Sequence, residues 1–169
     1  MRYREITTPD INNGRGFRVT LWISGCSRKC PGCHNQELWD YTLGKRLSAC
    51  TDELLDKVGY PYIKGLTISG GDPLDQNAES LDDLFHLLSI VKLKYPLKDI
   101  WIYSGGKFED MLKEWQKKKV LMMCDVLVDG PYIDELRDIT LPFRGSSNQR
   151  IIDIGRSFRL GEVVEYEIE

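Results

Sequence analysis

The sequence lacks long apolar runs, an excess of basic residues and a secretory leader. No stretch of its 169 residues approaches the roughly 18 consecutive apolar residues of a membrane span, and its first residues lead into no signal-peptide core. Lysine and arginine number 23 against 26 aspartates and glutamates, so a net charge of −3 provides no basic field for nucleic acid. We therefore expect a cytoplasmic protein with neither a membrane nor a nucleic-acid partner.

Histidine is scarce as well, with two residues, and no second Cys-x-x-Cys pair accompanies the one at 30–33. The five cysteines are an odd number, which argues against a disulfide framework and favours a reducing compartment. No composition break, repeat or linker divides the chain. We expect residues 1–169 to form a single domain.

Three of the cysteines, Cys26, Cys30 and Cys33, lie in one short segment. Closely spaced thiolates let one loop wrap a four-iron cluster, and three of them leave the fourth iron open for chemistry. Two alternatives stay open: Cys-Pro-Gly-Cys as a dithiol redox motif, or zinc bound by the three cysteines and His34. The dithiol leaves Cys26 unexplained, and adjacent zinc ligands at 33 and 34 struggle to reach two corners of one tetrahedron.

The rest of the chain alternates expected strands with expected helices. Strands are expected at 18–23, 65–69, 99–103, 124–131 with its turn, 150–154 and 163–168, and helices at 51–58, 81–91 and 108–115. A repeated order of a strand, a loop that contains glycine and a helix predicts a parallel sheet with right-handed crossovers. Ligands bind at the carboxyl ends of such strands, where the cysteine loop begins.

Six segments in register carry a resemblance to a known family. They are 10–18, 26–35, 69–74, 99–105, 128–130 and 144–150. The Cys-x3-Cys-x2-Cys loop resembles that of radical S-adenosylmethionine (SAM) enzymes, and the wider pattern resembles one branch of them, the anaerobic ribonucleoside-triphosphate reductase-activating proteins. The resemblance implies an α/β fold, a partial, open (β/α) barrel of the radical SAM type with mostly parallel strands; the chain is too short for eight units, which need roughly 200 residues.

The resemblance also implies a function. The catalytic residues would be Cys26, Cys30 and Cys33, holding a 4Fe-4S cluster that cleaves SAM reductively. The product would be a glycyl radical on anaerobic ribonucleoside-triphosphate reductase, with an electron supplied by a donor such as flavodoxin. The alternatives are an activase of another glycyl-radical enzyme, of the pyruvate formate-lyase type, and more remotely a zinc-binding interaction module.

The glycine-marked loops carry the expected SAM contacts. The cofactor-binding residues implied by the resemblance are Gly32, Cys33, His34, Gly70, Gly71, Asp72, Ser104 and Asp129. Residues 70–72 correspond to the stretch that holds the amino group of SAM, largely through backbone carbonyls, and 32–34 to positions whose backbone borders the adenine.

Two further segments keep two interpretations each. Arg28 and Lys29, inside the cysteine loop, are either solvated side chains or a docking patch for an acidic electron donor. The polar segment 144–150 is either a surface loop or a contact to SAM or the partner protein.

Overall fold

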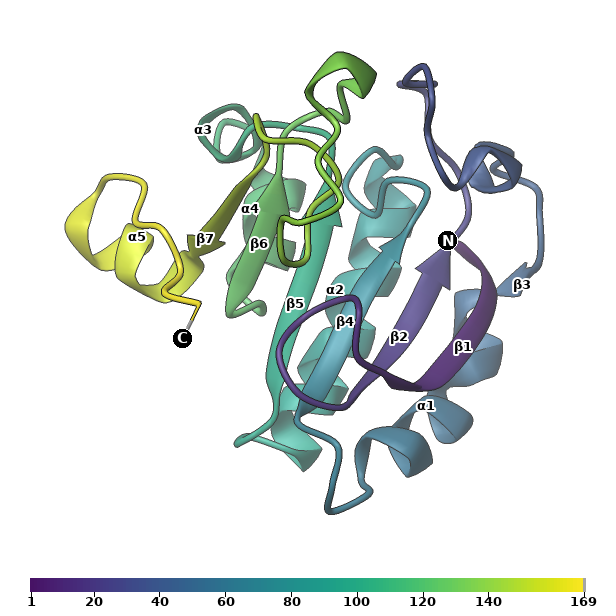
Figure 1. The fold of residues 1–169 in the computed structure, drawn as a ribbon. Helices are drawn as coiled ribbons and strands as arrows, with labels where there is room; N and C mark the ends of the chain where they lie inside the picture. The colour runs from purple at the N-terminus through teal and green to yellow at the C-terminus, as the bar shows by residue number, and fades with distance from the viewer. Residues whose placement is uncertain (169) are drawn as a thin grey trace.

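The computed structural model describes residues 1–168, and one seven-stranded sheet runs through it (Figure 1). In spatial order the strands are β3 (Lys45–Arg46), β1 (Arg2–Asp10), β2 (Arg18–Ile23), β4 (Gly65–Gly70), β5 (Asp99–Ser104), β6 (Val126–Asp129) and β7 (Arg150–Asp153). Strands β2, β4, β5 and β6 are parallel to one another. Strands β1, β3 and β7 pair antiparallel with their neighbours.

Within residues 1–168 five α-helices accompany the sheet; the first four lie between the parallel strands and the last follows β7. They are α1 (Thr51–Val58), α2 (Ala78–Lys94), α3 (Phe108–Met111), α4 (Trp115–Leu121) and α5 (Ile154–Leu160), with 3₁₀ turns η1 (Gln36–Leu38), η2 (Leu47–Cys50) and η3 (Asp134–Leu136). Figure 1 shows α1, α2 and α4 covering one face of the sheet. Within residues 1–168 no helix has both the length and the apolar character needed to span a membrane.

Apolar side chains that alternate along the strands form two layers, one on each face of the sheet. On β5, Ile100 and Ile102 join the core beneath the helices, whereas Trp101 joins a smaller cluster on the opposite face. Period-two alternation sends neighbouring side chains to opposite faces of a sheet. The smaller cluster is covered by loops, including Phe143 of the β6–β7 connection.

The expected partial barrel with mostly parallel strands is wrong. The structure is an open, mixed sheet in which three strand pairings are parallel and three are antiparallel. The physical reason lies on the two sides of the parallel strands: β1 pairs antiparallel with β2 on one side, and β7 pairs antiparallel with β6 on the other. Antiparallel strands on both sides of the three parallel pairings leave the sheet open, so the class is α/β without a barrel.

The other expectations on elements have mixed outcomes. Helix α1 has the expected bounds, and the four parallel strands lie where β-branched and aromatic runs predicted them. The expected helix at 108–115 is two short helices, α3 and α4. The expected strand at 163–168 is wrong, since that stretch makes one isolated bridge between Glu165 and Ile152.

Candidate metal centre and cofactor cavity

The cysteine loop leaves the carboxyl end of β2. Its three thiols, Cys26, Cys30 and Cys33, are free and line one cavity of about 320 Å³. Cys26 is buried, while Cys30 and Cys33 are half-buried. Burial raises the pKa of the Cys26 thiol and is the largest cause of that shift. A bound metal centre with cationic irons would favour the thiolate form there.

The cavity brings together eight of the ten residues expected at the site. These are Cys26, Cys30, Cys33, His34, Gly70, Gly71, Asp72 and Ser104. The loops after β2, β4 and β5 therefore meet at one place, as expected for the carboxyl ends of neighbouring parallel strands. The two expected residues that do not line the cavity are Gly32 and Asp129.

Asp129 is turned away from the cavity. Its buried carboxylate accepts hydrogen bonds from Arg150 Nε at 2.9 Å and from the Phe108 amide at 2.8 Å. Arg150 also donates to both carboxylate oxygens of Glu109, at 2.9 and 2.8 Å. The Asp129 side chain thus ties β6 to β7 and to the start of α3.

Gly32 and His34 meet the β6–β7 connection. A Cβ on Gly32, whose φ is 73°, would lie 2.5 Å from Asp134 Oδ1. The His34 ring lies edge-on to Tyr132 with centroids 6.2 Å apart, and the Tyr132 hydroxyl donates to Asp134 Oδ1 at 2.6 Å. The positive φ favours glycine at position 32, and a side chain there would also require the Asp134 side chain to move.

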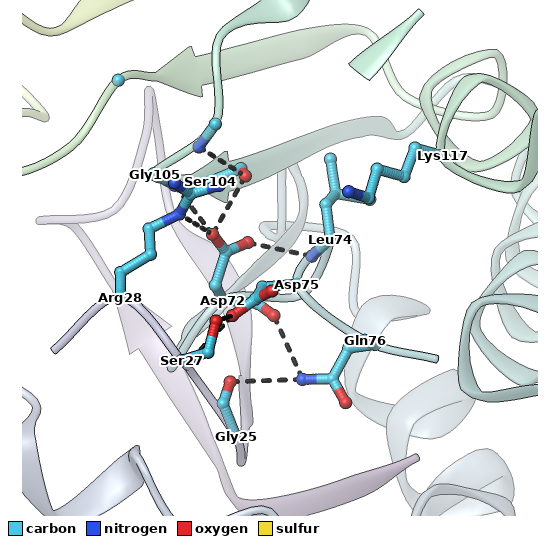
Figure 2. A network of polar contacts seen from close by, with 12 residues as sticks. Gly25, Ser27, Arg28, Asp72, Leu74, Asp75, Gln76, Ser104, Gly105 and Lys117 are labelled. Carbon is cyan, nitrogen blue, oxygen red and sulfur yellow. Dashed lines mark hydrogen bonds and ion pairs between the residues drawn. The ribbon is translucent and has the colours of Figure 1, made fainter. Parts of the chain in front are cut away.

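The start of the cysteine loop is clamped by residues that follow the Gly-Gly-Asp-Pro segment (Figure 2). The Asp75 carboxylate accepts from the Ser27 amide and hydroxyl, both at 2.6 Å, and from the Tyr41 hydroxyl at 3.0 Å. Gln76 Nε2 donates to the carbonyls of Ser24 and Gly25, each at 3.2 Å. Burial, followed by the bond to Asp75, raises the pKa of Tyr41 to about 12, so this hydroxyl stays a donor at neutral pH.

The two glycines after β4 serve backbone packing. Gly70 has φ 114°, a conformation that side chains rarely adopt, and its Cβ would lie 2.6 Å from Ile23 N. The Gly71 amide donates to Ile23 O at 2.8 Å, and a Cβ there would lie 2.8 Å from Leu38 O. These glycines let the loop after β4 lie directly against the root of the cysteine loop.

The polar segment 144–150 makes hydrogen bonds within the connection between β6 and β7. Gln149 Oε1 accepts from the Gly145 amide at 2.9 Å and the Ser146 amide at 3.2 Å, and Arg144 Nη1 donates to Gln149 O at 2.9 Å. Asn148 Nδ2 donates to Pro131 O at 2.8 Å. Gly145 and Gln149 also line the cavity, so the segment combines internal bracing with a place in the wall.

The donor set fits a multinuclear cluster better than a single ion. Within residues 1–168 no three His, Cys, Asp or Glu side chains converge closely enough to hold one metal ion, which disfavours the zinc alternative. Three thiols spread around a cavity suit a body of several atoms with sulfur-binding iron at its corners. Cys50 and Cys124 are buried elsewhere, in the core beneath the helices.

Several cavity and clamp residues were missed by sequence reasoning. They are Asn13, Trp22, Asn35, Tyr41, Asp75, Gln76, Tyr103, Gly130 and Tyr132. The available signal was closeness along the chain: Asn35 lies two residues after Cys33, and Asp75 and Gln76 directly follow the segment 69–74. Asn35 Nδ2 donates to Gly70 O at 3.1 Å, which joins the two motifs.

Comparison with known proteins agrees with this site. Residues 12–152 match the family model of a 4Fe-4S single cluster domain, which defines the class of the chain. The chain is 41% identical over 153 residues to the anaerobic ribonucleoside-triphosphate reductase-activating protein of Enterobacteria phage T4, covering 89% of this chain and 93% of that one. It is 36% identical to the protein of that name from Escherichia coli K12, covering 88% and 96%, and 38% identical to that of Haemophilus influenzae, covering 89% and 97%. The chain belongs to the family of anaerobic ribonucleoside-triphosphate reductase-activating proteins.

Proposed function

We propose that this protein activates anaerobic ribonucleoside-triphosphate reductase by generating a glycyl radical on it. The observation that carries the proposal is the convergence of Cys26, Cys30 and Cys33 on one cavity walled by the loops after β4 and β5. A reduced 4Fe-4S cluster bound there would supply the electron that cleaves a carbon–sulfur bond of SAM, and the 5′-deoxyadenosyl radical so released would remove hydrogen from a backbone glycine of the reductase.

The residues of this chain have distinct roles in the proposal. The three cysteines hold three irons, and the backbone at 70–72 and the Ser104 hydroxyl offer polar groups to SAM. His34 borders the same cavity beside Tyr132. Asp129 contributes by holding β6, β7 and α3 together. An external donor such as flavodoxin supplies the electron.

The test uses single cysteine-to-alanine variants, reconstituted with iron and sulfide under anaerobic conditions. Changing Cys26, Cys30 or Cys33 should abolish iron binding or leave a labile cluster, because each removes one of three ligands. Changing Cys50 or Cys124 should leave the iron content at the parent value. Iron per chain and the visible spectrum are the readouts, and the parent with SAM, reductant and the reductase should give a glycyl-radical EPR signal.

Two results would contradict the proposal. Equal iron loss on changing Cys50 or Cys124 would show that the wrong ligands have been chosen. A cluster-loaded parent that binds SAM and yet forms no radical on the reductase would remove the activase function while leaving the metal centre in place.

A further inference from the structure

Arg28, midway between the first two cysteines, is turned inward. Its side chain is 36% exposed, and its Nε donates to Asp72 Oδ2 at 3.0 Å. The guanidinium lies over the loop after β5, since a Cβ on Gly105 would come within 2.7 Å of Nε and one on Gly106 within 3.2 Å of Nη2. This contact ties Arg28 to the cavity wall, although part of its side chain, like that of Lys29, remains exposed.

Asp72 is the partner that holds Arg28 in place. Its side chain is 2% exposed, and its carboxylate also accepts from Ser104 Oγ at 3.2 Å, the Gly105 amide at 3.0 Å and the Leu74 amide at 3.0 Å (Figure 2). One carboxylate thus joins the cysteine loop to the loops after β4 and β5. The Arg28 guanidinium and these three donors therefore surround a single buried carboxylate.

The two residues also account for the fixed charge of the cavity. Among the described residues that line it, Arg28 is the only arginine or lysine and Asp72 the only aspartate or glutamate, and the two form an ion pair. The reduction potential of an iron–sulfur cluster depends on the net charge and hydrogen bonding around it. A lone cation beside the cysteines would favour the added electron and raise the potential, and a lone carboxylate would lower it.

We propose that Arg28 and Asp72 are a charge-compensated positioning pair, which keeps the cavity neutral and thereby sets the reduction potential of the cluster. This inference rests on the proposed cluster site at Cys26, Cys30 and Cys33. Pairing leaves Arg28 free to anchor the cysteine loop without making the cluster a weaker reductant. The pair acts through the cluster environment, and neither residue is a ligand of the metal.

The test is a charge cycle measured on reconstituted protein. Arg28→Gln, Asp72→Asn, the double variant and the parent are titrated with redox mediators, and the midpoint potential of the cluster is followed by EPR. Arg28→Gln should shift the potential to more negative values and Asp72→Asn to more positive values, while the double variant should return to the parent value. Lys29→Gln, in the same loop but exposed, is the matched control and should shift the potential less than Arg28→Gln does.

The cycle separates this inference from the proposed function. Shifts of both single variants in one direction, or a double variant that differs from the parent, would overturn the pair as the determinant of the potential. If a single variant fails to hold iron, the double variant and the charge-conserving Arg28→Lys decide, since both must match the parent. A parent that binds no cluster at all would instead remove the proposed function.

Discussion

A methyl group at Gly71 tests the packing of the loop after β4 against the cysteine loop. The Cβ of alanine at this position would lie 2.8 Å from Leu38 O and 2.9 Å from Gly25 C, and nearest of all to Gly25 O. All three are backbone atoms, so no rotation of a side chain relieves the contact. The substitution must instead displace the root of the cysteine loop.

The expected cost follows from the kind of contact. Extra methyl groups in a well-packed interior destabilise by about 1–3 kcal/mol, and Gly71→Ala should lie within this range, with Gly71→Val near its upper end. From the sequence alone, Gly71→Val would be expected to weaken SAM binding while leaving the cluster assembled. The structure changes that expectation, because Gly25 lies next to Cys26 and its displacement should also speed the loss of iron.

Two measurements check this prediction. Urea unfolding of the cluster-free chain gives the free energy of unfolding, and iron release to a chelator gives the retention of the cluster. Gly155→Ala is the control, since its Cβ would meet only Asp153 Oδ1, at 3.6 Å, and alanine within α5 should stabilise by about 0.5–1 kcal/mol. A Gly71→Ala protein with parental stability and parental iron retention would refute the reasoning.

Two further predictions concern titrating groups. Burial raises the pKa of Cys50 to about 11, so iodoacetamide at pH 8 should label the half-buried Cys30 and Cys33 of the cluster-free folded protein while Cys50 reacts only after unfolding; rapid labelling of Cys50 in the folded chain, seen by mass spectrometry, would contradict its burial. Hydrogen bonds from Arg150 lower the pKa of Glu109 to about 2 from an ordinary 4.5, so the pair stabilises above pH 4.5 and loses this contribution as the pH falls towards 2. Because Glu109 is 53% exposed, Glu109→Gln should reduce the free energy of unfolding at pH 7 by only about 0.5–1 kcal/mol, and a difference from the parent that grows on acidification would refute the assignment.

The elements that were predictable are those whose local pattern and tertiary environment agree. Helix α1 buries Leu54, Leu55 and Val58 on one face, and the parallel strands are almost continuously buried. Strand β1 was not predicted because its sequence is charged and polar, which an antiparallel strand with a solvated face permits; only Arg2 and Tyr3 of β1 pair with the two-residue β3. Pairing along β1 decides the fold class, and nothing local in the chain reports it.

Helix α5 was not predicted from the sequence, for a different reason. It begins with a β-branched residue followed by Gly155, both weak helix formers, so its periodicity is poor. The signals that remained were the caps: the Asp153 side chain accepts from the Arg156 amide at 2.8 Å, and Gly161 ends the helix with φ 72°. Caps without periodicity were too weak to outweigh a strand-like run farther along the chain.

The parts of the candidate site that could be predicted are those that depend only on spacing along the chain. Cysteines within one short loop must end near each other, and glycines after parallel strands must lie at one edge of the sheet. The partners of the polar side chains depend instead on tertiary register. Asp129 pairs across β6 and β7 with Arg150, while Asp72 reaches Arg28 on a different loop, and no distance along the chain distinguishes these outcomes.

The segment 10–18, one of the six that carry the family resemblance, packs around a buried arginine. A Cβ on Gly14 would lie 2.8 Å from Cδ of Arg18, which is fully buried. Arg18 Nε donates to Thr67 Oγ1 at 2.6 Å, and that hydroxyl donates to Asn13 O at 2.7 Å. A closed barrel fills its interior with side chains from its own strands. Here Gly14 makes room for the Arg18 side chain, and Asn13 of the same segment lines the cavity, so the segment contributes to the site through the cavity wall.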